Sequence, residues 1–349
     1  MPDAENSDLP TSDDPTSAPA AADPAAAEPG AAGLAASGAP APDVLTFGEA
    51  MVSIRTRQAL RLGGEASLSV AGSESNVAIG LARLGHHPRW VGAVGNDQPG
   101  QLVLRTLRAE GVDISLTRLS DTSFTGFIAF DQPAHDVTRV SYHRRGSAGS
   151  ELTVADVAKA LAAARPRLLH VTGITPALSE RARKATAYVV QAAAAEGVPV
   201  SLDVNYRSRL WSRAGAASCL RPLLPHLTTV FASDDELDIL TAAPDPVPAL
   251  LAAGVTEVVV TAGGAGAWTH TSAGTIHQPA LPVTVVDSIG AGDAFVAGYL
   301  SATLDALDIP ARLARATACG AFCVSAHGDW ESLPTRQDLT PHTPGTTLR

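Results

Sequence analysis

The segment from Asp287 to Asp293, Asp-Ser-Ile-Gly-Ala-Gly-Asp, carries the residue types best suited to chemistry. Its two glycines let the backbone approach a ligand closely. A helical pattern begins at about Ala291, so the amides of 290–293 are the unsatisfied donors of a helix N-terminus and attract an anion such as phosphate. The carboxylate of Asp293 cannot be a phosphate ligand, because it would repel the phosphate. It suits the role of base for the group that attacks the phosphorus.

Other phosphate-binding patterns do not fit this segment. A P-loop needs Gly-Lys-Ser or Gly-Lys-Thr, and neither Lys159 nor Lys184 follows a glycine. The same scarcity of lysine excludes the strand lysine of protein kinases. A dinucleotide fingerprint needs a small residue where Phe295 stands. A well-capped helix with a chance pair of glycines stays open as a purely structural interpretation.

The overall composition excludes several classes of function. The chain has 349 residues, 45% of them hydrophobic and 17% charged, which is enough for a sizeable buried core. Its apolar runs fall short of the roughly 20 residues that cross a bilayer. A net charge of −10 has the wrong sign for a nucleic-acid-binding surface. We therefore expect neither a membrane nor a nucleic acid as partner.

The three cysteines do not indicate a disulfide framework, because their number is odd. Cys319 and Cys323 stand four residues apart in a predicted helix. Half of a metal site is one interpretation of this spacing. The favoured interpretation is that both are small residues of a buried core, because free cysteine is often buried. Reduced thiols indicate a cytoplasmic protein.

Short apolar strands and amphipathic helices alternate along most of the chain. One helix has Ser73 as its predicted N-cap and stops at Gly85. Such alternation predicts βαβ units, and hence an α/β doubly wound, mostly parallel sheet with helices on both faces. The predicted strands are 44–47, 90–94, 168–171, 198–203, 229–232 and 257–261, with a β-rich stretch at 283–286 and final helices from about Ala291 and Pro310.

Two stretches interrupt this alternation, at about 52–70 and about 124–143. Within them, 127–130 and 139–143 are predicted to be paired strands. We expect both stretches to form a small β-sheet lid over the open end of the main sheet, where ligands of such sheets bind and where a lid excludes water.

The two ends of the chain are predicted to lie outside the folded domain. Residues 1–42 are rich in Ala, Pro and Asp and have almost no large apolar side chain, which predicts a disordered tail. The domain then spans 43–338, and 339–349 form a flexible C-terminal tail.

Two separate signatures resemble the PfkB, or ribokinase-like, family of carbohydrate kinases. One is Gly-Ser-Glu-Ser-Asn-Val-Ala at 72–78, continuing through Leu84-Gly85 and 91–100, and the other is the segment 287–293. The resemblance covers about 43–338. It implies a ribokinase-like fold with ATP and Mg²⁺ as cofactors, with Asp293 as general base and the amides of Gly290, Ala291 and Gly292 as the anion hole.

Three further stretches, 142–148, 173–178 and 203–207, resemble the 2-keto-3-deoxygluconate kinases within that family. A guanidinium binds a carboxylate bidentately, so arginines suit a sugar acid. A surface salt bridge is the structural alternative for Arg207. The chain departs from the subgroup at two positions. Ile128 stands where the subgroup often has a second lid tyrosine, and Ala71 stands where it has a glycine. The substrate-binding residues that the resemblance implies are Gly72, Asn76, Tyr142, Arg144 and Arg207.

The nucleotide side is assigned by the same resemblance. The pattern Ser233-x-x-Glu236 is expected to organise magnesium and phosphate, although a serine N-cap with acids in the first helical turn explains it equally well. Asp287 is a second candidate magnesium ligand, and whether a monovalent cation binds near it stays open. The implied nucleotide-binding residues are Ser233, Thr261, Gly263, Gly266, Gly290, Gly292 and Thr317.

These residues predict ATP-dependent phosphorylation of the primary hydroxyl of a sugar acid, with 2-keto-3-deoxygluconate as the favoured substrate. One alternative is a PfkB-type kinase for a neutral sugar such as fructose or ribose: the two arginines argue against it, and Ile128 leaves room for it. Another is a catalytically silent sugar-acid sensor, against which the intact Asp293 argues. The oligomeric state, including a homo-oligomer, stays open.

Overall fold

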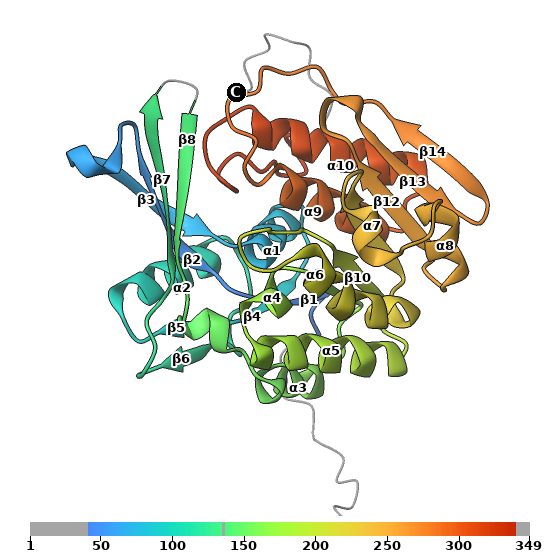
Figure 1. Ribbon diagram of the computed structural model, residues 1–349, viewed down its shortest axis with the longest axis horizontal. Coiled ribbons are helices and arrows are strands. Elements are labelled where there is room, and N and C mark those ends of the chain that lie inside the picture. Colours follow the sequence, from blue (N-terminus) through green and yellow to red (C-terminus); the bar gives the residue numbers. More distant parts are fainter. Residues whose placement is uncertain (1–40, 135–136, 340–349) are drawn as a thin grey trace, which may run out of the picture. The chain divides into compact units, whose positions relative to one another are not determined.

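The computed structural model describes residues 41–134 and 137–339. An eight-stranded sheet runs through it in the order β14-β13-β12-β11-β10-β9-β1-β4 (Figure 1). The six strands from β12 to β4 are parallel, while β13 and β14 join the edge as an antiparallel hairpin. The strands are β1 (Val44–Phe47), β4 (Pro88–Val91), β9 (Leu168–Thr172), β10 (Val200–Asp203), β11 (Thr229–Ser233), β12 (Glu257–Thr261), β13 (Ala267–Thr271) and β14 (Gly274–Gln278).

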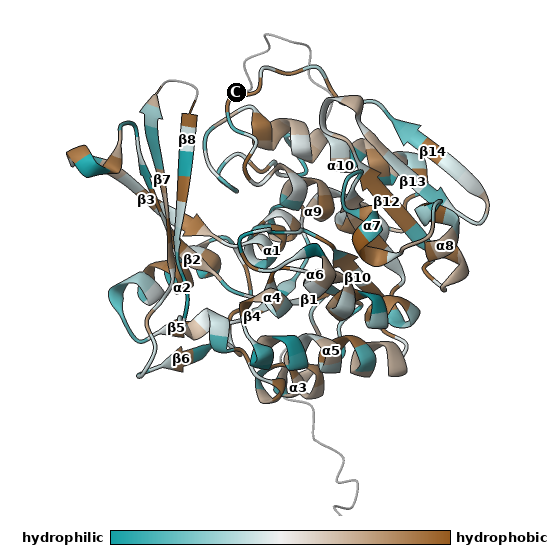
Figure 2. Ribbon diagram, viewed as in Figure 1, coloured by the Kyte–Doolittle hydropathy of each residue, from teal (hydrophilic) through white to brown (hydrophobic). Residues whose placement is uncertain are grey.

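Helices cover both faces of this sheet because its strands are apolar on both faces, as Figure 2 shows for β12. Successive side chains point to opposite faces. Leu45 packs into a core with α3, α5 and α6, and its neighbour Val44 packs into a core with α1, α9 and α10. The doubly wound prediction is confirmed. The helices are α1 (Ser73–Arg83), α2 (Gln98–Ala109), α3 (Val154–Ala163), α4 (Thr175–Leu178), α5 (Glu180–Ala195), α6 (Arg213–Leu220), α7 (Leu237–Leu240), α8 (Pro246–Ala252), α9 (Ala291–Leu304) and α10 (Ile309–Val324).

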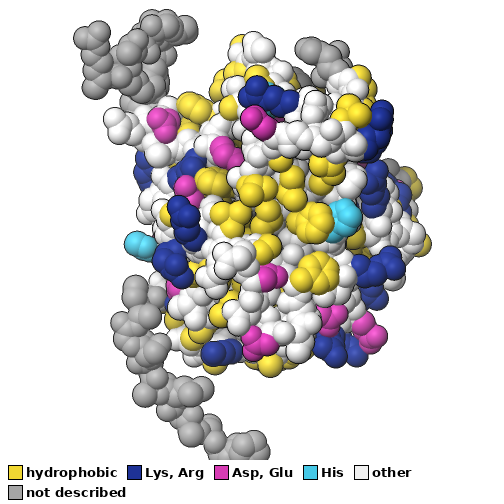
Figure 3. Space-filling view, turned by 90° about the vertical axis from the view of Figure 1, so that its left-hand side faces the viewer, with side chains coloured by type: hydrophobic (Ala, Val, Ile, Leu, Met, Phe, Trp, Pro, Cys, Tyr) yellow, Lys and Arg dark blue, Asp and Glu magenta, His cyan; other side chains and the backbone are white. Residues whose placement is uncertain are grey.

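A separate four-stranded sheet, here called the lid, has the order β3-β2-β7-β8. The predicted pair of stretches does form this sheet. Hydrophobic side chains gather on the face of the molecule that the lid forms (Figure 3). The exposed hydrophobic residues of the lid strands and of the turn between β2 and β3 include Leu60, Leu62, Leu68 and Val137. An apolar face of this kind is typical of an interaction surface. The lid strands are β2 (Met51–Thr56), β3 (Ala66–Ala71), β7 (Phe127–Ala134) and β8 (Val137–His143).

Three local predictions were wrong. The strand expected at 90–94 is broken after Val91, and the chain resumes as β5 (Ala93–Gly95), which pairs with β6 (Arg118–Ser120). Residues 283–286 form no strand, and Val285 is exposed. Ser73 is the first helical residue and not the cap, because Gly72 occupies the N-cap position of α1. The hairpin β13–β14 was not anticipated.

The bounds predicted for the domain and its two tails stay a prediction. Most of the predicted N-terminal tail, 1–40, and residues 340–349 lie outside the described residues. Within the described part, Cys319 and Cys323 are buried in the core, as the favoured interpretation expected. No helix in that part is both long and apolar enough to cross a bilayer.

Candidate active site

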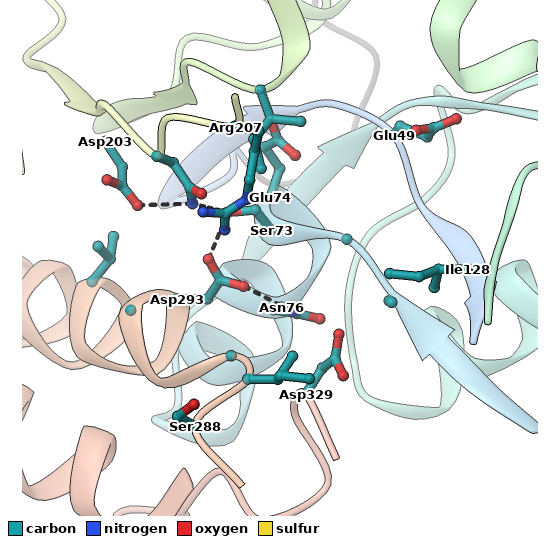
Figure 4. Close-up of a pocket in the computed structure, with 18 of the residues that line it drawn as sticks. Glu49, Ser73, Glu74, Asn76, Ile128, Asp203, Arg207, Ser288, Asp293 and Asp329 are labelled. Carbon is teal, nitrogen blue, oxygen red and sulfur yellow. Dashed lines mark hydrogen bonds between the residues drawn. The ribbon is translucent and has the colours of Figure 1, made fainter. Parts of the chain in front are cut away.

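A cavity of about 430 Å³, here called the sugar pocket, opens where the carboxyl ends of the parallel strands meet the first turns of α1 and α9 and the inner side of the lid (Figure 4). Asp203 at the end of β10, Ser233 at the end of β11 and Thr261 at the end of β12 line it. This is the edge at which open α/β sheets bind ligands.

Asp293 lies in the first turn of α9 with its carboxylate buried. Two side chains one turn apart on α1 hold it: Ser73 Oγ donates to Oδ1 at 2.6 Å, and Asn76 Nδ2 donates to Oδ2 at 2.8 Å (Figure 4). Burial raises the pKa of Asp293, against the hydrogen bonds from Ser73 and Asn76 and the positive charge of Arg207. A fixed carboxylate with a raised pKa is suited to accept a proton.

The N-terminus of α9 offers backbone donors beside this carboxylate. In the described part of the chain, the amides of Gly290, Gly292 and Asp293 have no hydrogen-bond partner, and the amide of Ala291 makes only a long 3.4 Å contact with Ser288 O. Gly290 has φ of +79°, and a Cβ there would strike the carbonyl of Asp329. Only glycine allows this close turn, which leaves the donors facing the sugar pocket.

The two predicted arginines stand in different electrostatic states. Arg144 Nε donates to Glu49 Oε2 at 2.5 Å; the Glu49 side chain is buried, and the Arg144 side chain is 10% exposed. Arg207 is exposed at the pocket, and its one hydrogen bond in the described part is a 3.4 Å contact with the carbonyl of Tyr206. Arg207 and Asp293 line the same pocket, as Figure 4 shows, and the charge of Arg207 lowers the pKa of Asp293. Arg207 is therefore the cation that an anionic ligand can pair with directly.

The remaining predicted sugar-binding residues also line the pocket. A Cβ at Gly72 would strike the carbonyl of Glu49, so glycine is needed here for the close packing of these two segments beside the pocket. Tyr142 lies opposite Ile128 in the β7–β8 pairing, with its ring 5.5 Å from the Arg144 guanidinium. Asn76 donates a hydrogen bond from its amino group to Asp293, and its buried Oδ1 has no partner among the described residues.

The predicted nucleotide residues divide into two groups. Ser233, Thr261, Gly290 and Gly292 line the sugar pocket, whereas Gly263, Gly266 and Thr317 do not. Gly266 has φ of +96° in the turn between β12 and β13. Thr317, on α10, is buried with an unpaired Oγ1, which leaves it a free polar atom for a ligand group.

Glu236 is fixed by the backbone. Its Oε1 accepts from the amide of Tyr206 at 2.6 Å, and its Oε2 accepts from the amide of Ser233 at 2.9 Å. The alternative interpretation of Ser233 as an N-cap is wrong, because α7 begins only at Leu237 and Ser233 Oγ donates to Asp235 Oδ1 at 2.7 Å. Glu236 therefore faces the pocket as an oriented carboxylate without a cationic partner in the described part.

Asp287 stands apart from the pocket lining. Its Oδ1 accepts from the amide of Ile289, and its Oδ2 accepts from Arg55 of the lid, each at 3.0 Å. Arg55 also pairs with Asp329 and stacks 4.0 Å over Phe130. Asp287 is thus paired with a guanidinium, whereas a carboxylate that binds magnesium is expected to be free of a cationic partner.

The described residues contain no group of three or more His, Cys, Asp or Glu side chains arranged around a metal. Mg²⁺ nevertheless suits this pocket, because it is usually bound by one or two carboxylates together with phosphates and waters. Asp203 and Glu236 supply such carboxylates. Burial, followed by the negative charges of Glu236 and Asp293, raises the pKa of Asp203 well above its usual range, against the positive charge of Arg207.

Sequence reasoning missed several residues of the site. Glu49, the partner of Arg144, directly follows Gly48 near the carboxyl end of β1, and that position alone could have identified it. Glu74 accepts hydrogen bonds from Thr172 and Thr175 deep in the pocket. Asn205, with φ of +41°, donates to Ser73 Oγ at 3.0 Å. These contacts join segments far apart in the chain, so no local pattern announces them.

Comparison with known proteins agrees with this geometry. The model of the pfkB family carbohydrate kinases matches residues 41–336. A 2-dehydro-3-deoxygluconokinase of Bacillus subtilis (strain 168) is 36% identical over 306 residues, covering 85% of this chain and 94% of the relative. A fructokinase of Klebsiella pneumoniae is 35% identical over 281 residues, covering 77% of this chain and 90% of the relative. The crystal structure of a PfkB protein from Polaromonas sp. JS666 superposes with a TM-score of 0.77 at 35% identity, covering 86% of this chain and 99% of that one. The family match spans nearly the whole described domain, and the protein belongs to the PfkB family of carbohydrate kinases.

Proposed function

We propose that this carbohydrate kinase phosphorylates a sugar acid, 2-keto-3-deoxygluconate, at its primary hydroxyl with ATP as donor. The observation that carries the proposal is Arg207, which lines the same pocket as the buried Asp293 and has no acidic hydrogen-bonding partner among the described residues. A cation in that place favours a substrate with a carboxylate. The 2-dehydro-3-deoxygluconokinase of Bacillus subtilis, 36% identical, supports the same substrate class.

In the proposed reaction, Asp293 accepts the proton of the primary hydroxyl while the hydroxyl oxygen attacks the γ-phosphorus of ATP. Ser73 and Asn76 hold the carboxylate in one orientation, which keeps a lone pair directed at the substrate. The amides of Gly290, Gly292 and Asp293 stabilise the negative charge that the transferring group carries. The lid excludes water, which would otherwise compete with the sugar as acceptor.

Glu236 and Asp203 are the residues that would hold Mg²⁺, the first through an orientation fixed by two backbone amides. When bound, the ion neutralises charge on the phosphates of ATP. Asp287 takes no part in this proposal, because Arg55 already pairs with it. A monovalent cation near Asp287 would have to compete with the same guanidinium, so we expect equal kcat values in potassium chloride and in tetramethylammonium chloride.

A neutral sugar is the second candidate substrate, and two observations favour it. Glu49 already neutralises Arg144, which leaves one unpaired arginine instead of two for a substrate carboxylate. Ile128 offers the substrate no hydrogen bond, and a fructokinase of Klebsiella pneumoniae is 35% identical to this chain. The silent sensor is disfavoured, because a sensor needs neither the held carboxylate of Asp293 nor the donors beside it.

The compartment proposed from the sequence is the cytoplasm. All three cysteines are free, and two of them are buried, which suits a reducing environment. Activity of the untagged enzyme in a cytosolic fraction, and its absence from a secreted fraction, would test this placement.

The test of the substrate is kcat/KM for 2-keto-3-deoxygluconate and for fructose in the wild type and in Arg207→Leu. Loss of a charge-assisted hydrogen bond should lower kcat/KM for the acid by roughly tenfold to a hundredfold and leave fructose within about threefold. Arg105→Leu is the matched control, since Arg105 is exposed on α2 and lines neither pocket. Equal losses for both sugars would make Arg207 structural, and a wild type that prefers fructose would favour the second candidate.

A further inference from the structure

A second cavity, here called the arginine pocket, adjoins the sugar pocket and has a volume of about 860 Å³. Its walls are the lid segment 137–145, the end of α4 and the loop 206–210 that follows β10. Four residues line both cavities, so a ligand in one meets side chains of the other. The shared residues are Val140, Tyr142, Arg144 and Arg207.

The charge of this cavity is opposite to that of its neighbour. Among its described lining residues there is no acid, whereas the sugar pocket has carboxylates from several strands and helices. The chain as a whole has a net charge of −10, so this concentration of positive charge is local. Such a pocket attracts anions. The five arginines that line it are Arg139, Arg144, Arg145, Arg207 and Arg209.

Most of these guanidinium groups keep donors available for a ligand. Each has five N–H groups. Arg209 uses one on the carbonyl of Val140 at 2.7 Å, and Arg139 lies 3.9 Å from Asp131 with 60% of its side chain exposed. Arg145 has no hydrogen-bond or ion-pair partner in the described part, and Arg207 only a weak contact with its neighbour's carbonyl. Arg144 is neutralised by Glu49.

The available arginines come from two opposing sides of the cavity. Arg139 and Arg145 belong to the lid, on and just after β8, and Arg207 and Arg209 belong to the loop after β10. A ligand with two anionic groups can engage both sides at once. Tyr206, Leu178 and Leu210 provide a less polar surface between them for a short carbon chain. A single small anion would use only part of this cavity.

We propose that the arginine pocket is a second anion-binding site, and that it takes a phosphorylated sugar acid. Such a molecule carries a phosphate at one end and a carboxylate at the other, which matches the two groups of arginines. The identity of the ligand rests on the proposed function, because a phosphorylated sugar acid is the class of its product. Since Arg207 and Tyr142 serve both cavities, the bound ligand hinders entry of the sugar acid, and the product class thereby restrains the enzyme.

The test uses 6-phosphogluconate, a stable phosphorylated sugar acid, titrated into the full-length enzyme without ATP in a calorimeter. The wild type should bind it, and Arg139→Gln/Arg145→Gln should weaken binding by more than about tenfold. Arg105→Gln/Arg108→Gln, an equal loss of two charges at exposed positions on α2, should bind as the wild type does. Both altered lid arginines are exposed, so folding is not at risk. An unchanged Kd in the double variant would place the ligand in the sugar pocket and overturn the proposal.

Two further arms separate the chemistry of the ligand. Inorganic phosphate and gluconate, each titrated alone, should bind at least about tenfold more weakly than 6-phosphogluconate, because each engages one group of arginines. Equal binding of phosphate would overturn the assignment to a sugar acid. In kinetic assays on whichever sugar the enzyme accepts, inhibition by 6-phosphogluconate should be competitive with the sugar and relieved in the double variant. A preference for fructose as substrate would refute the proposed function and leave this binding test intact.

Discussion

The carboxylate of Glu49 and the guanidinium of Arg144 form a buried ion pair at 2.5 Å that joins the main sheet to the lid. Glu49 follows β1, and Arg144 follows β8. Glu49 also accepts from Ser147 Oγ at 2.5 Å, and a Cβ at Gly149 would lie 2.5 Å from its side chain. The close packing around Glu49 fixes the base of the lid.

Glu49→Gln should therefore destabilise the fold. Removing one partner of a buried ion pair typically costs about 3–5 kcal/mol, because the other charge stays buried and unpaired. We expect the free energy of unfolding in urea to fall by about 3 kcal/mol. The double variant Glu49→Gln/Arg144→Met should recover part of that loss. Effects of the two single changes that simply add would show that the pair is not coupled.

Asp293→Asn keeps the size of the side chain and its bond from Ser73 but cannot accept a proton. Loss of a general base typically lowers the rate by 10²–10⁴-fold. We expect kcat to fall in that range, with a change of less than about threefold in the Kd of the sugar. Steady-state kinetics and calorimetry give the two values. A kcat close to that of the wild type would remove Asp293 from the role of base.

Ser73→Ala should shift the pH dependence of the reaction. Ser73 donates to Asp293 and favours its charged form, so its loss raises the pKa of Asp293 further above the usual value. Because the base must be deprotonated, the acidic limb of kcat/KM should move upward by about one pH unit. Ser75→Ala is the matched control, since Ser75 Oγ donates to the carbonyl of Gly72 and not to Asp293. An unmoved limb in Ser73→Ala would mean that another group sets it.

The sequence predicted those parts of the molecule that depend on local patterns. Buried parallel strands such as β12 consist of continuous apolar runs, and the start of α9 combines two closely spaced glycines with an aspartate, so both could be recognised. The same local reasoning mistook 283–286 for a strand, because four β-formers in a row look alike whether or not a neighbouring strand pairs with them.

The electrostatic state of the site depends on pairings that the sequence cannot announce. Arg144 and Arg207 are the same residue type in equally suggestive motifs, yet Glu49, 95 positions before Arg144, neutralises the first and leaves the second available. Arg55 and Asp287 are 232 positions apart, and their contact removes a carboxylate from the candidate metal ligands. Only the folded chain distinguishes these cases.

Asp329 makes the stability of the fold depend on pH, and this dependence can be tested separately from activity. Burial raises its pKa to about 7, although the charge of Arg55 and the bond from it oppose the rise. In the unfolded chain the carboxyl returns to an ordinary pKa near 4. Between these values the folded state binds the proton more tightly, so the contribution of Asp329 to stability is full below about pH 4 and is lost as the pH rises towards 7.

Asp329→Asn cannot titrate, so the free energy of unfolding of the wild type should fall relative to this variant by on the order of 2 kcal/mol between pH 5 and pH 8. Urea denaturation at both pH values gives the comparison. Asp305→Asn is the control. Burial raises the pKa of Asp305, but the hydrogen bonds and charges of Arg336 and Arg315 outweigh this effect and lower the pKa to about 2. The contribution of Asp305 to the free energy of unfolding therefore does not change between pH 5 and pH 8. A difference between wild type and Asp329→Asn that stays constant from pH 5 to 8 would mean that Arg55 keeps Asp329 charged throughout, and that a permanent ion pair joins the lid to the segment after α10.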